Sequence, residues 1–236
     1  MKHPILSFLL ALTIASVSTA CAVEVEAKTE AEESVVVVPL AVSEPNKTAP
    51  KDRKSSVRIV TGSGICSATK IAPKVLLSAS HCFHTETKIL IVGDKPAIVV
   101  HIVADDNDHA LVLLDEIVLE DLAALGPAPK EGDSIHYWGN PYVFTMLLRR
   151  GYVSGFDNVN TIYDINGYHG DSGAGVFNDK KQLVGVISYI HGKNSFSMMG
   201  SYPFNFTAAQ LKEVGLKPMP LLMTGTSAGV KLNYQQ

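Results

Sequence analysis

The chain contains many short apolar runs separated by turns, and this pattern restricts its fold more than any other feature. Val57–Val60 alternates as a half-buried strand does, and Val75–Ser78 is apolar enough for a buried one. The 18 glycines and 12 prolines supply many turns. Short strands at such close spacing predict an all-β barrel or sandwich. The other runs are Ile89–Val92, Ala97–Val100, Leu111–Leu114, Ile135–Trp138, Gly151–Gly155 and Leu183–Ile187.

One short helix is predicted near the end of this region. Thr207 is a suitable N-cap, Ala208–Val214 forms the helix, and Gly215 and Pro218 end it. The helix is therefore expected over residues 207–214. Residues 216–236 carry no pattern and are expected to form a tail.

The overall composition excludes some functions. Of the 236 residues, 46% are hydrophobic and 18% are charged, which is typical of a globular protein with a substantial core. A formal net charge of -3 argues against a general nucleic-acid surface. We therefore expect no nucleic-acid partner. The sequence does not indicate an oligomeric state.

The first 22 residues have the order of a secretory signal. Lys2 and His3 precede the apolar run Ile5–Val17, and small residues follow it up to Ala22. The run is short for a membrane span. We expect export to a periplasmic or extracellular location, with residues 1–22 as the signal.

Cys21 leaves two alternatives for this signal. Ser18–Cys21 resembles a bacterial lipoprotein box, although Ser18 stands where leucine is commonest, and cleavage there makes Cys21 a lipid anchor. Cleavage after Ala22 instead removes the cysteine. A lipid at Cys21 is the only membrane attachment expected. In both cases Cys66 and Cys82 remain as a pair, for which an oxidising compartment predicts a disulfide.

Residues 23–55 are expected to be a flexible linker. Six glutamates, three prolines and the basic cluster Lys51–Lys54 give this segment mixed charge, and it has no aromatic residue. Val35–Val38 is the exception, because it reads either as a strand packed on the domain or as an apolar part of the linker.

The hexapeptide Gly170–Gly175 carries the clearest chemical signal. Ser172 lies between glycines, which allow a sharp turn and a close approach of substrate. The N–H groups of Gly170 and Ser172 can point at one spot beside the hydroxyl and form an oxyanion hole. A glycine-rich turn is the alternative. A serine nucleophile also needs a base and a group that orients the base.

Candidates for both groups lie upstream. His81 follows an apolar run and small residues, and Asp108 precedes the apolar run Leu111–Leu114. His81 alone reads equally well as a structural histidine, and Asp108 alone reads more readily as a turn residue. Together the three motifs stand in the order His81, Asp108, Ser172.

In this order the motifs resemble those of trypsin-like serine peptidases of the chymotrypsin fold, in their bacterial form. Ser78–Cys82, Asp108–Leu111 and Gly170–Gly173 are similar to the family's histidine, aspartate and serine motifs. The resemblance implies two six-stranded Greek-key β-barrels and a closing helix. The peptidase domain is expected over residues 56–215, with barrels over about 56–125 and 126–206. Cys66 and Cys82 match the family's disulfide beside the histidine.

The resemblance also implies a mechanism, that of an exported serine endopeptidase acting on polypeptides. His81 takes the proton of Ser172, Asp108 orients the imidazole, and the amides of Gly170 and Ser172 hold the oxyanion. A covalent acyl-enzyme is then hydrolysed. No metal or cofactor is required.

The resemblance also bears on substrate specificity and on activation, where this chain departs from the family in part. It places Asn166 at the base of the primary specificity pocket, whose uncharged floor and narrowing by Ile190 favour small or medium apolar side chains. The other expected pocket residues are Ser188, Tyr189 and Gly200. Arg58–Gly62 imitates an activation site but lies too close to Cys66, so we interpret it as a strand. Activation through a new amino terminus at Ile59 is therefore not expected, and the residue that pairs with Asp171 is left open.

Three other functions remain open. A catalytically silent or latent protease-fold binding protein of the cell envelope has the same sequence features. An esterase uses the same triad. The cluster His101, Asp105, Asp106, Asp108 and His109 offers oxygen and imidazole ligands for a cation.

Overall fold

The computed structural model describes residues 49–84, 86–115, 119–193 and 196–222. These residues all belong to one structural unit, Pro45–Gln236. The predicted signal at 1–22, Cys21, most of the linker and the end of the tail lie outside the described residues.

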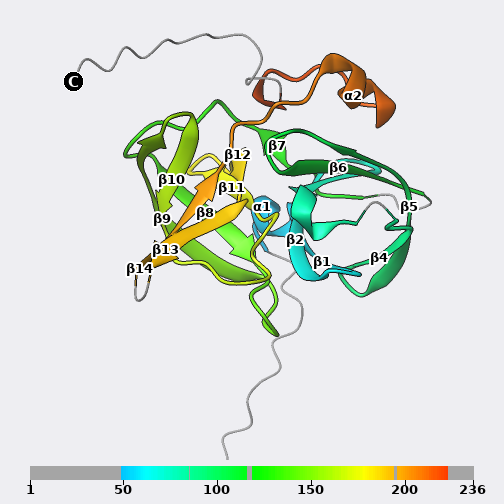
Figure 1. The fold of residues 1–236 in the computed structure, drawn as a ribbon, viewed down its shortest axis with the longest axis horizontal. Coiled ribbons are helices and arrows are strands. Elements are labelled where there is room, and N and C mark those ends of the chain that lie inside the picture. The colour runs from blue at the N-terminus through cyan, green and yellow to red at the C-terminus, as the bar shows by residue number, and fades with distance from the viewer. Residues whose placement is uncertain (1–48, 85, 116–118, 194–195, 223–236) are drawn as a thin grey trace, which may run out of the picture. The chain divides into compact units, whose positions relative to one another are not determined.

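The first strand system is a closed barrel. Its strands follow the order β1-β2-β3-β6-β5-β4, and every neighbouring pair is antiparallel (Figure 1). Closure leaves no free sheet edge. The strands are β1 (Ser56–Thr61), β2 (Gly64–Ala72), β3 (Val75–Ala79), β4 (Ile89–Val92), β5 (Lys95–Ala104) and β6 (His109–Leu114).

The sequence that imitates an activation site lies inside this barrel. Ile59 is in the middle of β1, paired with Cys66 on one side and Val92 on the other, and it is fully buried. The interpretation of this segment as a strand is confirmed.

The second strand system is a sheet of eight strands in the order β13-β14-β10-β9-β8-β11-β12-β7. The strand of this sheet that comes first along the chain, β7, lies within the span predicted for the first barrel. It nevertheless pairs in parallel with β12 of the second sheet. The connection between the two systems thus adds an edge strand that the sequence did not indicate. The strands are β7 (Ala124–Leu125), β8 (Ser134–Gly139), β9 (Leu147–Asp157), β10 (Asn160–Asp164), β11 (Gly175–Asn178), β12 (Gln182–Val186), β13 (Tyr189–Lys193) and β14 (Phe196–Ser201).

A short helix, α1 (Lys51–Ser55), occupies the end of the predicted linker. Asp52 in this helix is only 3% exposed. Its carboxylate accepts hydrogen bonds from His136 Nε2 at 2.7 Å and from Trp138 Nε1 at 3.0 Å, both on β8. The prediction of a flexible linker is therefore wrong for residues 51–55, because one buried carboxylate fixes them to the second sheet.

The predicted C-terminal helix is confirmed as α2 (Ala208–Glu213). Thr207 Oγ1 accepts from Gln210 N, and the Gln210 side chain accepts from Thr207 N, which forms a capping box. The start of the predicted tail also packs, since Leu221 and Leu222 are buried in the core. None of the helices in the described residues is long and apolar enough to cross a membrane.

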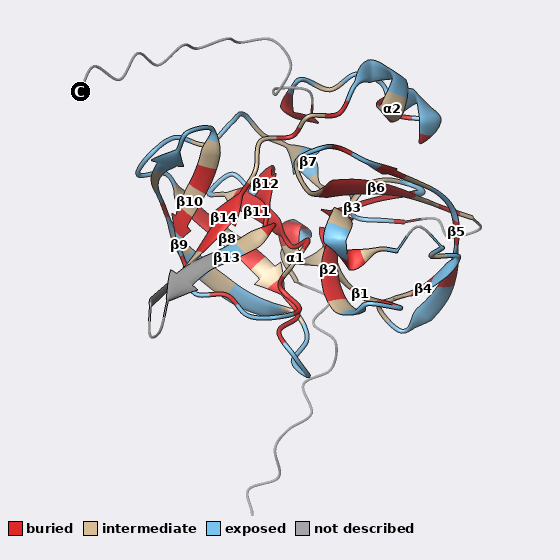
Figure 2. Ribbon diagram, viewed as in Figure 1, coloured by how far each residue is buried: buried red, intermediate tan, exposed pale blue. Residues whose placement is uncertain are grey.

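The largest core cluster joins the two strand systems. It contains Leu77 and Leu111 from the first barrel, Phe177 and Leu183 from the second sheet, and Leu211 from α2. Figure 2 shows β6, β11 and β12 as largely buried, and each of these strands contributes at least one side chain to this core. Burial of such side chains supplies most of the driving force for folding.

The predicted disulfide between Cys66 and Cys82 is present. It joins β2 to the 3-10 turn η1 (Ser80–Cys82), across 16 residues of chain. Cross-linking a loop of this length restricts the unfolded chain.

Replacing both cysteines, Cys66→Ser with Cys82→Ser, is expected to lower the free energy of unfolding by about 3 kcal/mol. Chemical denaturation under non-reducing conditions measures this change. Cys21→Ser serves as the control and leaves the free energy of unfolding unchanged. Equal stability of the double variant and the wild type contradicts the prediction.

Candidate active site

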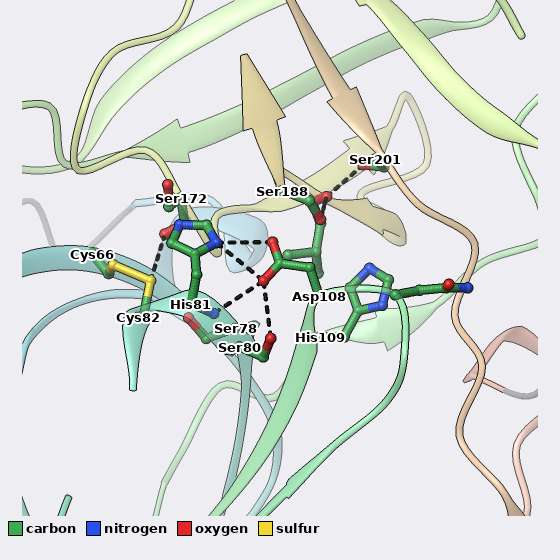
Figure 3. Close-up of polar contacts among 12 residues, drawn as sticks. Cys66, Ser78, Ser80, His81, Cys82, Asp108, His109, Ser172, Ser188 and Ser201 are labelled. Atoms are coloured by element: carbon green, nitrogen blue, oxygen red, sulfur yellow. Dashed lines mark hydrogen bonds and ion pairs between the residues drawn. A yellow bond between two sulfur atoms is a disulfide. The ribbon is translucent and has the colours of Figure 1, made fainter. Parts of the chain in front are cut away.

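His81 lies in η1, directly after β3 has carried the chain out of the first barrel. Its ring Nδ1 lies 2.8 Å from Asp108 Oδ2 and 3.1 Å from Oδ1, and its backbone N–H donates to Oδ1 at 3.0 Å. Figure 3 shows the aspartate facing this edge of the ring. The ring is 48% exposed, so its other edge is open to a reactant.

Asp108 lies in the turn between β5 and β6 with a φ of 64°, in the left-handed region. Aspartate tolerates this region better than most residues. Ser80 holds it on both sides, because its N–H donates to the Asp108 carbonyl and its hydroxyl donates to Oδ1, each at 2.9 Å. The carboxylate is thereby aimed at His81.

The two side chains shift each other's protonation. The hydrogen bond with Asp108 raises the pKa of His81 above its usual 6.5, against the opposing effect of burial. Burial alone raises the pKa of Asp108, but the hydrogen bonds from His81 and Ser80 outweigh it, so the pKa lies below its usual value. The pair therefore favours a charged aspartate and stabilises the imidazolium.

A second aspartate–histidine pair supports the turn that carries Asp108. Asp105 and His109 are fully buried side chains, with 2.8 Å between Oδ2 and Nδ1. Asp105 Oδ1 also accepts from the N–H groups of Asn107 and His109, each at 2.9 Å. Asp105 Oδ2 accepts from Asn205 N, and the His109 ring packs on Phe204. The carboxylate thus fixes the backbone on both sides of Asp108.

These contacts divide the residues of the candidate cation cluster among different partners. Asp105 pairs with His109, Asp108 with His81, and His101 Nε2 with Glu213. No group of three or more candidate ligands gathers in the described residues. The geometry does not favour the cation-site alternative.

Ser172 lies in a glycine loop that a strand of the first barrel holds in place. Ser67 of β2 donates its N–H to the Ser172 carbonyl and its hydroxyl to the Gly170 carbonyl, each at 2.8 Å. Gly170 has a φ of +102°, and a Cβ there would lie 2.3 Å from the Asn140 carbonyl oxygen. Gly173 has a φ of +83°, and a Cβ there would lie 2.2 Å from the Ser67 carbonyl oxygen. Only glycine fits at both positions.

The predicted oxyanion amides are free to bind a ligand. Neither Gly170 N–H nor Ser172 N–H donates to an acceptor among the described residues. Ser172 and Gly170 line a hollow of about 430 Å³ together with His81. In Figure 3 Ser172 lies beside the ring, on the side away from Asp108. The hydroxyl forms no hydrogen bond with the His81 ring in this described region.

Other residues line the same hollow and were not predicted from the sequence. Tyr142 and His169 line it, and so do Ile65 and the two cysteines of the disulfide, Cys66 and Cys82. A tyrosine or histidine in a loop has no distinctive pattern. Only its position beside Ser172 reveals its role in shaping the hollow.

Asp171 finds its partners within the second sheet. The side chain is fully buried, and Oδ2 accepts from Tyr137 Oη and Tyr168 N, each at 3.0 Å. Arg149 Nε lies 3.6 Å from Oδ2. Burial raises the pKa of Asp171 in spite of these partners. Tyr137, Tyr168 and Arg149 are therefore the partners of Asp171 that the sequence left open. Ile59 is not among them, because it lies within β1.

The residues expected to form the specificity pocket are partly assembled. Ser188 N donates to the Gly200 carbonyl at 3.0 Å, and the Tyr189 ring covers Gly200. Ile190 is 43% exposed. Asn166 is also exposed, and its carbonyl accepts from Tyr137 Oη at 3.2 Å. The assignment of Asn166 to a pocket floor stays a prediction.

The Asp105–His109 pair leads to a test of the geometry around His81. In Asp105→Asn the turn loses its anionic anchor, so Asp108 loosens and the pKa of His81 falls towards 6.5. Titration of the His81 imidazole by NMR measures this shift. The exposed neighbour gives the control, Asp106→Asn, with no shift expected. If Asp105→Asn is less stable but the pKa of its His81 equals that of the wild type, the Asp105–His109 pair stabilises the fold without positioning Asp108.

Comparison with solved structures gives the fold. The Rv3671c protease from M. tuberculosis in its active form aligns with a TM-score of 0.59 at 17% identity, covering 81% of this chain and 96% of that one. An inactive form of this protease gives 0.57, also at 17% identity, covering 70% of this chain and 90% of that one. The serine endoprotease from Yersinia pestis gives 0.54 at 18% identity, covering 65% of this chain and 62% of that one.

The sequence itself places the chain in a family. No curated protein matches it. The profile of the trypsin-like peptidase domain, in contrast, matches residues 62–186, which is more than half of the 236 residues and includes all three motifs. The chain therefore belongs to the trypsin-like peptidase domain family.

Proposed function

We propose that the protein is a serine endopeptidase that acts through His81, Asp108 and Ser172. The observation that carries the proposal is the 2.8 Å contact between His81 Nδ1 and Asp108, with Ser172 lining the same hollow as His81. A nucleophile, a base and a group that orients the base are the three parts that nucleophilic catalysis by serine needs.

In the proposed reaction, Nδ1–H of His81 donates to Asp108. This tautomer leaves Nε2 with a lone pair, which accepts the proton of Ser172 as the hydroxyl attacks the peptide carbonyl. The imidazolium then protonates the leaving amine. The charged Asp108, whose pKa is held low, stabilises the imidazolium while it exists.

The free amides of Gly170 and Ser172 bind the oxyanion of the tetrahedral intermediate. Preorganised donors of this kind act without reorganisation at the moment of reaction, and removing one typically costs about 10²–10³-fold in rate. Collapse of the intermediate gives an acyl-enzyme at Ser172. Water activated by His81 hydrolyses it.

We propose that this site needs no cleavage before Ile59. Ile59 is buried in β1, and Asp171 is already bonded by Tyr137 and Tyr168. Arg149 Nε lies 3.6 Å from the carboxylate and supplies an opposite charge, so a new amino terminus is not required to pair with Asp171. The uncut chain has its glycine loop in place.

Substrate choice and location are part of the proposal. An uncharged Asn166 and the exposed Ile190 favour small or medium apolar side chains at the cleaved residue. The basic, apolar and small-residue order of residues 1–22 supports export to a periplasmic or extracellular site, with Cys21 either lipidated or removed.

One observation favours a second candidate, a latent or silent protease-fold binding protein. Ser172 Oγ and His81 are not hydrogen-bonded in the described site, whereas an activated serine needs that bond. Catalytic hydrogen bonds are often long without substrate and tighten in the complex, so the endopeptidase remains the better-supported function.

Fluorophosphonate labelling tests the activated serine. The wild-type protein is expected to label at Ser172, and Ser172→Ala abolishes labelling. Ser63→Ala is the matched control, because Ser63 lines the same hollow but is not one of the three proposed catalytic residues. A folded wild type that does not label would favour the silent binding protein. Labelling with hydrolysis of esters but not of a peptide library would favour an esterase.

The pH dependence of peptide cleavage tests the His81–Asp108 pair. His81 must be neutral to accept the proton, and Asp108 raises its pKa, so kcat/KM rises with pH through an apparent pKa above 6.5. Asp108→Asn lowers kcat by about 10⁴-fold because the imidazole loses its orientation. A wild-type profile without this ionisation, or an unimpaired Asp108→Asn enzyme, contradicts the assignment.

Mass spectrometry of the labelled protein tests activation. The labelled chain is expected to begin before Ile59 and to remain intact at the Arg58–Ile59 bond. Labelling confined to chains that begin at Ile59 would show that cleavage is needed after all.

A further inference from the structure

The connection between β8 and β9 exposes three consecutive large apolar side chains. Tyr142 is 53% exposed, Val143 82% and Phe144 58%. Leu147 and Leu148, at the start of β9, are each 38% exposed. Soluble proteins expose single apolar residues routinely, but a contiguous group marks an interaction surface. We refer to Tyr142–Phe144 as the apolar tip.

The backbone of this connection holds the apolar tip in one conformation. Tyr142 has a φ of 52° and Met146 one of 54°, both in the left-handed region. Asn140 Oδ1 accepts from Met146 N at 3.0 Å, and the His169 carbonyl accepts from Tyr142 N at 2.9 Å. A rigid loop keeps its apolar side chains exposed at little additional loss of conformational entropy on binding.

Three basic side chains lie beside the apolar tip. They line a hollow of about 440 Å³ together with Thr145 and Met146, which directly follow the tip, and with one acid, Asp94. The three cations are Arg53, Lys54 and Arg58.

The chain enters the described domain at the same place. Ala49 lines the same hollow. The residues that precede it include the apolar run Ile5–Val17 and Cys21.

We propose that the apolar tip docks on an anionic lipid bilayer. Tyr142, Val143 and Phe144 insert among the headgroups, and the three cations contact the lipid phosphates beside them. Apolar insertion combined with attraction of Lys and Arg to anionic lipids is how peripheral proteins bind membranes. The proposal does not depend on catalysis by Ser172.

Two other occupants fit the surface less well. A two-fold dimer places the same patch of both copies face to face, which opposes the three cations to three others. A peptide substrate explains Tyr142, which lines the hollow of Ser172, but not Val143 or Phe144, which lie outside it. Anionic lipid accounts for the apolar tip and the cations together.

Depth-dependent quenching tests the proposal on the full chain. The variant Phe144→Trp places an indole at the apolar tip, and Phe156→Trp places one at a similarly exposed position near the far end of β9. Each is mixed with vesicles of phosphatidylcholine and phosphatidylglycerol that carry brominated acyl chains. The native Trp138 contributes to both variants alike, so the wild-type signal serves as the baseline.

The indole introduced by Phe144→Trp is expected to lose about half of its fluorescence, because indoles at the interface lie close to the brominated chains. The Phe156→Trp signal changes little. The loss decreases when phosphatidylglycerol is omitted or salt is added. If Phe144→Trp does not fold, Val143→Trp replaces it.

Because the probe is local, membrane attachment through the first 48 residues cannot imitate the result. Vesicle-bound protein without selective quenching at the apolar tip overturns the proposal, and so does equal quenching of both variants. If the indole is not quenched and analytical ultracentrifugation instead shows that the protein self-associates, the proposal is overturned in favour of a second copy as the partner of this surface. Added to Phe144→Trp, Val143→Asp abolishes the selective effect, whereas Val159→Asp, at an exposed valine outside the patch, retains it.

Discussion

The arrangement of the candidate site depends on Ser67, a residue of the first barrel that holds the serine loop of the second sheet. Its amide and hydroxyl bond the carbonyls of Ser172 and Gly170, and its own carbonyl accepts from Ser78 Oγ at 2.7 Å. Asn140 Nδ2 donates to the Ser67 hydroxyl at 2.9 Å. One small buried side chain therefore links both strand systems at the point where His81 and Ser172 meet.

Both loops of the candidate site are built around a buried carboxylate. Asp105 accepts the amides of Asn107 and His109 and so holds the turn of Asp108. Asp171 accepts the amide of Tyr168 and so holds the loop of Ser172. Burying a charge is costly unless hydrogen bonds compensate, so each carboxylate requires its loop to keep one conformation. This requirement preorganises the site before a substrate arrives.

The sequence predicted many of the strands, though not β2, β7, β10, β11, β13 or β14. It also predicted the cap at Thr207, the disulfide and the three motifs, because each depends on local pattern or on a short signature. It did not predict the role of Ser67 or the pairing of Asp105 with His109, since a serine or a histidine has no special pattern before folding. The helix at Asp52 was missed for the same reason, as its partners His136 and Trp138 lie 84 and 86 residues away. Tertiary contacts decide such positions.

Tyr142 connects the candidate site to the outer surface. It lines the hollow of Ser172, its ring lies 6.0 Å from that of Tyr168, and its side chain begins the apolar tip. The Arg149 guanidinium lies 4.9 Å from the centre of the Tyr168 ring, and Arg149 also pairs with Asp171. A continuous set of contacts thus runs from the exposed loop to the residue beside Ser172. Tyr142 is therefore shared by the wall of the hollow that holds Ser172 and by the apolar tip, so its side chain contacts whatever binds at either place.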